Sequence, residues 1–450
     1  MMNKKFNVST PSGFPEFCPK REKVRQQWIK VISETYASHG FQPIYTPLVE
    51  RDENLVGKGG NPKEIYALRR LQATDEDKSH SGNALRFDHT VPLALYVARH
   101  LNDISFPFRR QAIGPVFRGE RAQKGRYRQF DQCDIDVIGS ENLSFFHDAE
   151  MVAIITKIFT KLNIGEFVIR INNRKILTGF FADLGISADK IKPVLDIVDD
   201  LEKLPPAKIM ENFAEQGLTN DQTNKILEFT NVTGEPTEIL NYLKGINGGE
   251  DFTTGVQELE TVLTGIKALK VPAQNFIVDL KIARGLDYYT GTVYETKLVG
   301  HESLGSICSG GRYNDLAKIF TKKNLPGVGI SIGLTRLLGQ LFDAGIIQAD
   351  TASPSHILVV PQDEKLVPNA IELSQQIRDI LGLSVETYLD KKKFVKKLDY
   401  ADKLGIPFVA IIGEREIENN SFVLKNMTTG EQNTHSIENI ESIMGELIVF

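Results

Sequence analysis

The segment from Phe130 to Val137 restricts the fold more than any other part of the sequence, because its side chains alternate strictly in character. Such alternation is typical of a β-strand, in which successive side chains point to opposite faces of a sheet. One face would belong to the core, with Cys133, Ile135 and Val137. The other would carry Phe130 and then a polar, acidic row, Gln132, Asp134 and Asp136. We therefore expect a sheet whose second face either meets solvent or lines a binding site.

A dense group of cations precedes this strand. Between Arg118 and Arg128 the chain has one acidic residue, Glu120, and five cationic ones: Arg118, Arg121, Lys124, Arg126 and Arg128. The planar fork of arginine binds phosphate oxygens in pairs. The sequence has no G-x-x-x-x-G-K-[ST] loop, so a nucleotide site would have to use arginines rather than a backbone cradle. The loop therefore predicts a triphosphate clamp between two strands, with a solvated basic loop as the alternative from charge alone.

Two other segments carry unusual polar residues. In IARGLDYYTGTVYE, from Ile282 to Glu295, alternation places Arg284 and Tyr288 on one strand face. Tyr289 points to the opposite face unless Gly285 introduces a bulge, and Thr290-Gly291 fits a two-residue hairpin turn between strands at 282–289 and 292–297. The glycines of GVGISIGLTRL at 327, 329 and 333 do not form a dinucleotide-binding fingerprint.

The length of 450 residues predicts two or three domains. A helix is expected from Arg21 to His39, ended by Gly40, and the extended segment Phe41–Glu50 contains Pro43 and Pro47, which favours a sheet edge or an interface. A helix around 92–102 and two strands follow before Gly139. This order is not that of repeated βαβ units.

The domain boundaries follow from changes in this pattern. We expect a core from 1–185 and 270–345, a helical insertion at 186–269, a polar linker at 346–355 and an α/β domain at 356–450. In the last domain, short strands at 357–360, 385–389 and 408–412 alternate with helical stretches, which predicts a partly parallel sheet.

Composition excludes several classes of protein. The net charge is −5 and no apolar run is long enough to span a membrane. Three distant cysteines and eight histidines without an H-E-x-x-H pattern do not indicate a metal site or a disulfide framework. The first residues, MMNKKFNVSTPSGF, lack the apolar core and cleavage site of an export signal, so a cytoplasmic location is expected.

Taken together, these segments resemble class II aminoacyl-tRNA synthetases. The helix and strand ending at Pro47 resemble motif 1, FRGER with its strand-loop-strand resembles motif 2, and GISIGLTRL resembles motif 3. The peptides ARGLDYYTGTVYE and CSGGRY, the latter at Cys308–Tyr313, are similar to two peptides of histidyl-tRNA synthetases. The resemblance implies an α+β catalytic domain with an antiparallel sheet flanked by helices, a helical insertion, and a C-terminal α/β anticodon-binding domain. It also implies a homodimer formed through motif 1.

The resemblance further implies roles for individual residues. ATP would be bound by Arg118, Glu120, Arg126, Phe130 and Arg336. Histidine would be bound by residues from several segments, including RFDHT at 86–90: Asp88, His89, Thr90, Arg118, Gln132, Asp136, Arg284, Tyr288, Tyr289 and Tyr313. Arg284 and Arg118 would act in catalysis, and Arg121 and Gln123 would meet the acceptor end of the tRNA. Asp88 and Asp136 stand where many family members have glutamate.

The implied activity is ATP-dependent formation of histidyl-adenylate, followed by transfer of histidine to tRNA(His). The partners would be ATP, L-histidine and tRNA(His), with Mg²⁺ accompanying ATP through ligands that the sequence does not assign. The basic helix in DKKKFVKKLDYADKLG is expected either to position RNA or to form an ordinary solvated face. The main alternative is a non-catalytic histidine sensor, like the synthetase-related regulatory subunit of ATP phosphoribosyltransferase.

Overall fold

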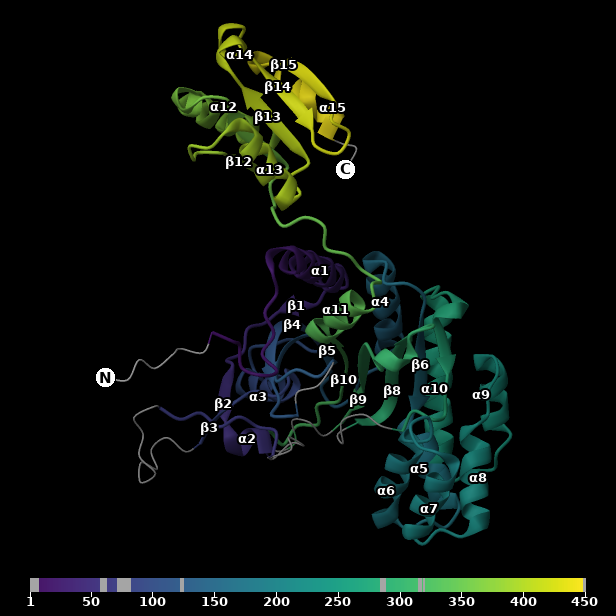
Figure 1. Cartoon of the computed structure of the whole chain (residues 1–450). Coiled ribbons are helices and arrows are strands. Elements are labelled where there is room, and N and C mark those ends of the chain that lie inside the picture. Colours follow the sequence, from purple (N-terminus) through teal and green to yellow (C-terminus); the bar gives the residue numbers. More distant parts are fainter. Residues whose placement is uncertain are drawn as a thin grey trace, which may run out of the picture. The chain divides into compact units, whose positions relative to one another are not determined.

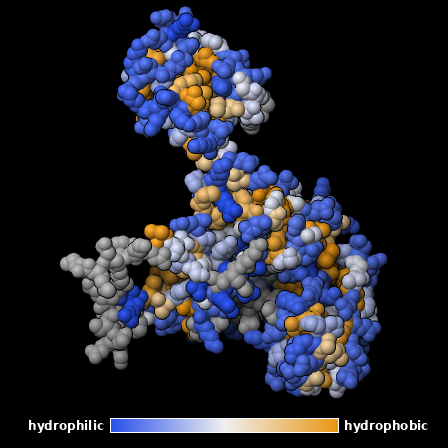
Figure 2. Space-filling model, in the orientation of Figure 1, coloured by the Kyte–Doolittle hydropathy of each residue, from blue (hydrophilic) through white to orange (hydrophobic). Residues whose placement is uncertain are grey.

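The computed structural model describes residues 8–56, 63–70, 82–121, 125–283, 289–314, 318 and 320–447. The chain forms two compact units, one from Met1–Glu16 and Trp28–Ile347 and the other from Phe17–Gln27 and Gln348–Phe450. Figure 1 shows the elements of each unit. No helix among the described residues is long and apolar enough to cross a membrane, and hydrophilic residues cover much of the visible surface in Figure 2.

A sheet of eight strands forms the centre of the first unit. The strands run in the order β1 (Gln42–Pro43), β4 (Phe108–Phe117), β5 (Gln129–Ile138), β10 (Gly327–Gly333), β9 (Cys308–Tyr313), β8 (Tyr289–Leu298), β6 (Phe167–Asn173) and β7 (Phe276–Val278). All pairings from β4 to β6 are antiparallel, and the two edge strands pair in parallel. The expected antiparallel sheet is confirmed.

Helix α1 (Pro19–Ser38) leads into the edge of this sheet. Gly40 ends the helix with a φ of +78°, and the Phe41 amide donates to the Tyr36 carbonyl at 3.2 Å, which is the pattern of a Schellman cap. The expected helix and its glycine stop are confirmed. The strand that follows, β1, contains only the two residues Gln42 and Pro43.

The segment between β1 and β4 forms a small sheet and a helix. Strands β2 (Val49–Arg51) and β3 (Asn83–Leu85) pair with each other, with α2 (Asp52–Val56) after β2. Helix α3 (Thr90–Arg99) buries Leu93, Ala94 and Val97 against Phe108 and Ile138, which pair with each other at one end of the β4–β5 ladder. The expected order of a helix followed by two strands is confirmed.

Helices cover the sheet. Helix α4 (Phe146–Leu162) contacts β9 and β10, α10 (Glu250–Ala268) contacts β6 and β8, and α11 (Leu334–Asp343) contacts β5 and β10 (Figure 1). The core strand residues Cys133, Ile135 and Val137 are fully buried. On this face the Tyr36 hydroxyl of α1 donates to the Cys133 carbonyl at 3.0 Å.

The region from 186 to 269 is helical, as expected. It contains α6 (Ala188–Asp199), α7 (Pro206–Glu215), α8 (Asn220–Thr230), α9 (Pro236–Lys244) and α10, after α5 (Arg174–Asp183). Helix α10 differs from the other four because it packs along α4 and α5. A Cβ added at Gly265 would lie 2.6 Å from the Cβ of Ala149 in α4, so these helices approach closely at this glycine. The last helix of the segment therefore belongs to the layer that covers the sheet.

The expected hairpin turn at Thr290-Gly291 is wrong. Both residues lie inside β8, which continues from Tyr289 to Leu298. Tyr289 pairs with Tyr313 and Val293 pairs with Gly311, so β8 contains two more residues than β9 between these pairs. A bulge absorbs the extra residues, and the chain does not reverse. The residues 284–288, which include most of the expected preceding strand, lie outside the described part of the chain.

The second unit contains a sheet in the order β12 (Val385–Thr387), β11 (Ile357–Pro361), β13 (Phe408–Ile412), β14 (Ser421–Asn426) and β15 (Gln432–Ser436). The first three strands are parallel and the others antiparallel, which confirms the expected mixed sheet. The helices are α12 (Val367–Leu381), α13 (Phe394–Leu404), α14 (Glu414–Glu418) and α15 (Met444–Leu447). Within this unit, the Lys23 ammonium of α1 donates to the Thr351 hydroxyl at 2.8 Å. This contact of α1 was not expected.

Candidate functional site

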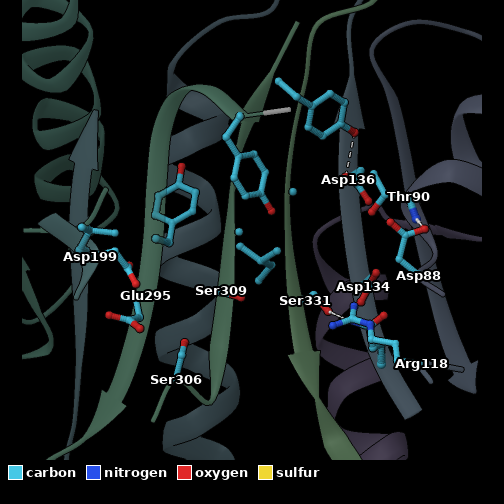
Figure 3. Close-up of a pocket in the computed structure, with 18 of the residues that line it drawn as sticks. Asp88, Thr90, Arg118, Asp134, Asp136, Asp199, Glu295, Ser306, Ser309 and Ser331 are labelled. Carbon is cyan, nitrogen blue, oxygen red and sulfur yellow. Dashed lines mark hydrogen bonds between the residues drawn. The ribbon is translucent and has the colours of Figure 1, made fainter. Parts of the chain in front are cut away.

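The polar face of β5 lines a cavity of about 390 Å³ in the first unit. Gln132, Asp134 and Asp136 all contribute to its wall, while the intervening residues point into the core. The predicted alternation of the strand is therefore confirmed, and its acidic face lines a cavity. Figure 3 shows Asp134 and Asp136 projecting from this strand, with Asp88 and Thr90 close by.

At one end of the cavity, Asp136 is held by two buried partners. Arg110 lies directly opposite on β4 and its Nη2 is 2.6 Å from Asp136 Oδ2. The Tyr313 hydroxyl of β9 donates to Asp136 Oδ1 at 2.8 Å. Between these strands Gly329 of β10 leaves no room for a side chain, since a Cβ there would lie 2.2 Å from Asp136 Oδ1. The carboxylate is thus fixed in position.

Sequence reasoning missed Arg110. It is fully buried, and its neighbour Arg109 points to the other face of the strand, where it pairs with Glu150 at 2.6 Å. The two arginines are adjacent in sequence, so composition does not distinguish them. Arg110 could have been identified from the register between β4 and β5, because this register places Arg110 opposite Asp136.

Asp134 is a further buried carboxylate that the predicted site did not include. Its Oδ1 has no hydrogen-bond partner within the described part of the chain. Burial raises the pKa of Asp134 to about 7, with Asp136 and Asp88 adding to the effect, although Arg110 and a hydrogen bond from Ser331 oppose it. Burial also raises the pKa of Asp136 to about 6. The cavity wall therefore carries carboxyl groups that titrate near neutral pH.

Asp88 and Thr90 lie at the start of α3. Asp88 Oδ1 accepts hydrogen bonds from the amides of Thr90 at 3.2 Å and Val91 at 3.0 Å, which caps the helix. Both Asp88 and Thr90 line the cavity. Asp88 Oδ2 is buried and has no partner among the residues described. One oxygen of this carboxylate thus serves the backbone and the other faces the site.

His89, which the sequence grouped with the histidine-binding residues, does not line the cavity. Its Nε2 lies 3.1 Å from the Gly114 carbonyl, and burial lowers the pKa of His89 to about 3. His89 faces away from the cavity because it lies at the start of α3, where consecutive side chains point in different directions. His89 is therefore a neutral, buried residue of the support beneath the cavity.

A second cavity of about 250 Å³ adjoins the first. Its lining contains every residue predicted to bind ATP: Arg118, Glu120, Arg126, Phe130 and Arg336. Arg118 and Gln132 line both cavities. Arg118 Nε donates to the Phe87 carbonyl at 3.1 Å, and its guanidinium lies 5.2 Å from the centre of the Phe130 ring. An arginine held in this way stands where an acidic cavity meets a cationic one.

Two cations beside this second cavity are close together. Burial lowers the pKa of Arg336, and the nearby charge of Arg126 acts in the same direction. Arg336 Nε is buried without a partner in the described residues. Arg126 is 3.6 Å from the single acid of the loop, Glu120. An unsatisfied guanidinium N–H beside a second cation favours an anion with several oxygens.

The remaining predicted site residues fall into two groups. Tyr289 and Tyr313 line the first cavity, and the bulge of β8 lies between Tyr289 and Val293. The bulge expected at Gly285 falls outside the described residues. Arg284, Tyr288 and Gln123 lie outside the described residues, and Arg121 is exposed at the edge of the described loop. The cavity wall also includes residues that the sequence did not indicate: Asp199, Lys203, Glu295, Ser306, Ser309 and Ser331.

Comparison with known proteins decides the family. Residues 13–337 match a family described as histidyl-tRNA synthetase, and residues 356–447 match an anticodon binding domain. The chain belongs to the histidyl-tRNA synthetase family. The histidine-tRNA ligase of Nostoc sp. is 49% identical over 443 residues, which cover 96% of each chain. That of Clostridium tetani is 45% identical over 430 residues, or 95% of each.

Solved structures support the same family assignment. A crystal structure of histidyl-tRNA synthetase from Nostoc sp. superimposes with a TM-score of 0.91 at 48% identity, covering 98% of this chain and 100% of that one. A Bacillus halodurans protein described as an ATP phosphoribosyltransferase regulatory subunit/histidyl-tRNA synthetase has a TM-score of 0.74 at 19% identity, covering 91% and 99% of the chains. The latter likeness concerns the fold alone. The resemblance inferred from the motifs is confirmed.

The three motifs of the histidyl-tRNA synthetase family meet in this structure. Motif 2 forms β4, its loop and β5, and motif 3 forms β10 and α11, whose strand lies directly beside β5. The motif 1 strand β1 pairs with the other edge of β4. Segments separated by some 200 residues are thus neighbours in one sheet. The site is assembled by this strand order.

The raised pKa of Asp134 predicts how the ligand-free protein responds to pH. Its carboxyl group titrates near pH 7 when folded and near 3.8 when unfolded, so between these values the folded state binds more protons. The free energy of unfolding therefore falls as pH rises through this range. We expect Asp134→Asn to be more stable than the wild type near pH 8, by about 1 to 3 kcal/mol, since each unit of pKa corresponds to about 1.4 kcal/mol.

Urea denaturation of both proteins near pH 5 and near pH 8 measures this effect. The advantage of Asp134→Asn should be smaller at the lower pH, where the wild-type carboxyl group is already protonated. A variant that is less stable than the wild type at both pH values would contradict the assignment of a destabilising buried charge to Asp134.

Proposed function

We propose that this chain is a histidine-tRNA ligase that activates L-histidine with ATP and transfers it to tRNA(His). The observation that carries the proposal is the junction at Arg118, where a carboxylate-lined cavity meets a cationic cavity. An amino acid in the first cavity and a nucleotide in the second would bring a carboxylate and an α-phosphate together at this arginine. The family membership supports the same reaction.

In the first step, an oxygen of the histidine carboxylate attacks the α-phosphorus of ATP. The bond from that phosphorus to the bridging oxygen breaks, and pyrophosphate leaves with the electron pair. Such a displacement depends on positioning and on neutralising charge, since no strong base is needed. We propose that Arg118 faces the reacting phosphate, while Arg126 and Arg336 face the terminal ones. Arg284 is proposed to act beside Arg118, on the resemblance alone.

The nucleotide's other contacts are proposed from the second cavity. Phe130 and Glu120 would contact the adenine. Among the described residues that line this cavity, Glu120 alone carries a carboxylate. An Mg²⁺ ion bound here would therefore be held mainly by phosphate oxygens and water. When bound, the ion would neutralise phosphate charge.

The imidazole of histidine is proposed to bind at the Asp136 end of the cavity. Asp136 can accept a hydrogen bond from a ring N–H, and its orientation is fixed by Arg110 and Tyr313. A site that offers a buried acceptor to a substrate N–H discriminates strongly against side chains that leave this acceptor without a hydrogen bond. Asp88, Thr90 and Gln132 would bind the α-amino group, with Tyr288 and Tyr289 near the ring.

In the second step, the terminal hydroxyl of tRNA(His) attacks the carbonyl carbon of the adenylate and AMP leaves. Arg121 and Gln123 are proposed to contact the acceptor end. The second unit would bind the anticodon arm through exposed lysines, with Lys393 at the N-cap of α13 and Lys396 and Lys403 within the helix. Lys397 does not contribute to this surface, because it is buried and donates to the Pro361 carbonyl at 2.7 Å.

We also propose a cytoplasmic homodimer. The segment after the edge strand β1 carries Tyr45, which is 85% exposed, and Val49, which is 39% exposed. An edge strand flanked by exposed apolar side chains favours burial against a second copy.

ATP-pyrophosphate exchange with each of the amino acids tests the proposed activity. We expect exchange with histidine alone. We expect Asp136→Asn to raise the KM for histidine on the order of 100-fold with little change in the KM for ATP, because it removes a charged hydrogen-bond acceptor. The exposed Asp103, with 77% of its side chain accessible, supplies the matched control Asp103→Asn. Absence of exchange would favour a regulatory histidine sensor.

A further inference from the structure

Asp134 stands in the middle of the cavity wall, between the two ends that the proposed function uses. We infer that Asp134 is a specificity-determining residue that binds the α-ammonium group of histidine together with Asp88 and Gln132. This inference rests on the proposed function and adds to it a residue that the sequence motifs did not indicate.

The position of Asp134 follows from strand geometry. Residues two apart on a strand share a face and are about 6.6 to 6.8 Å apart, so Asp134 lies midway between Gln132 and Asp136. Its direct neighbours across the sheet are small, Ala112 on β4 and Ser331 on β10. A histidine that reaches from Arg118 to Asp136 along this face must therefore pass the carboxylate of Asp134.

The unsatisfied atoms of the cavity wall indicate the chemistry of the ligand. Asp134 Oδ1, Asp88 Oδ2 and Gln132 Oε1 are all buried without a hydrogen-bond partner in the part of the chain that is described. Gln132 is oriented by its Nε2, which donates to the Ser331 hydroxyl at 2.9 Å and leaves Oε1 free. All three atoms are acceptors. An ammonium group has three donors and no acceptor, so it is complementary to this set.

The acids on the opposite wall are already paired. Asp199 forms an ion pair with Lys203, and Glu295 forms one with Arg170 at 3.1 Å. Figure 3 shows Asp199 and Glu295 across the cavity from Asp134 and Asp88. An ammonium group therefore gains more from the wall that carries unpaired oxygens.

The charges around Asp134 support the same assignment. The charged and titratable groups that act on it or respond to it are the cations Arg110 and Arg86, the acids Asp88 and Asp136, and the buried Tyr36 and Cys308. Burial and the two acids raise the pKa of Asp134 to about 7. An ammonium group bound beside Asp134 would lower this pKa again. Binding of histidine near pH 7 would then release a proton from the carboxyl group.

The affinities of three ligands, measured by calorimetry, test the contact. Histidine and histidinol have an α-ammonium group and an imidazole, whereas 3-(imidazol-4-yl)propionate has the imidazole and carboxylate but no amine. In Asp134→Asn we expect histidine and histidinol to bind roughly 10- to 100-fold more weakly, because the amide oxygen of asparagine lacks the negative charge that strengthens a hydrogen bond from an ammonium group. The affinity for the propionate should change by less than about twofold, a difference too small to represent a lost hydrogen bond. Asp103→Asn serves as the control.

Two outcomes would overturn the inference. Equal weakening of all three ligands would place the contact at the imidazole, and unchanged affinities would remove Asp134 from the binding site. Failure of the proposed function is recognised separately, because wild-type exchange with histidine tests it without any variant.

Proton release by the wild type tests the inference even if Asp134→Asn fails to fold. Histidine binding near pH 7, measured in buffers of different ionisation enthalpy, should release more protons than binding of the propionate once the ionisation of each free imidazole is subtracted, since the pKa of Asp134 is raised to about 7 in the free protein. Equal release by the two ligands would overturn the inference.

Discussion

Arg118→Gln is expected to lower the rate of histidine-dependent ATP-pyrophosphate exchange on the order of 100- to 1,000-fold, the loss found when one charge-stabilising donor is removed from an active site. Arg118 lines both cavities and is held by the Phe87 carbonyl and the Phe130 ring. Its guanidinium is therefore placed before the substrates bind. Glutamine keeps hydrogen-bonding ability but loses the charge that neutralises the reacting phosphate.

Steady-state exchange as a function of both substrates measures this effect. The loss should appear mainly in kcat, because the developing charge is greatest in the transition state. Arg51→Gln is the matched control, since the Arg51 side chain is 75% exposed and lines neither cavity. A kcat for Arg118→Gln within about threefold of wild type would contradict the role, because it corresponds to less than about 1 kcal/mol of barrier.

Arg110→Met is expected to reduce the free energy of unfolding of the first unit by about 3 to 5 kcal/mol, as is found when one partner of a buried ion pair is removed. Arg110 is fully buried, pairs with Asp136 at 2.6 Å and opposes the raised pKa of Asp134. Without this cation three buried carboxyl groups, Asp88 included, would face one another. Their pKa values would rise further, so the loss should be larger near pH 8 than near pH 5.

Denaturant unfolding at both pH values measures the loss. Arg109→Met is a sharp control, because Arg109 is the adjacent residue but pairs with Glu150, of which 21% of the side chain is exposed. Its loss should be smaller, since a solvent-accessible pair contributes less. The double variant Arg110→Met with Asp136→Leu should recover part of the stability, because the uncompensated charge is gone. A wild-type midpoint for Arg110→Met at both pH values would contradict the proposed charge balance.

Local patterns in the sequence determined much of the fold. The alternation from Phe130 to Val137, the helix stopped by Gly40 and the arginine-rich loop are all found in the structure. These features were predictable because side-chain direction along a strand and the end of a helix depend on a few consecutive residues. The arginines of the loop indicated phosphate for a similar reason, since the chemistry of the side chain does not depend on the fold.

The structure alone decided how distant segments combine. It paired Arg110 with Asp136, kept Thr290-Gly291 inside β8, and turned His89 away from the cavity. Each outcome depends on the register between strands or on the packing beneath a helix start, which no short segment encodes.

The acidic strand from Phe130 to Val137 shows the same division. Its alternation predicted that Asp134 and Asp136 share a face. Burial by strands that are distant in the sequence then raised their pKa values to about 7 and about 6 and left Asp134 Oδ1 without a partner. The sequence by itself determined which side chains point together, because backbone geometry sets that direction. Only the tertiary structure decided their charge and their vacant hydrogen bonds, because these depend on which groups exclude water around them.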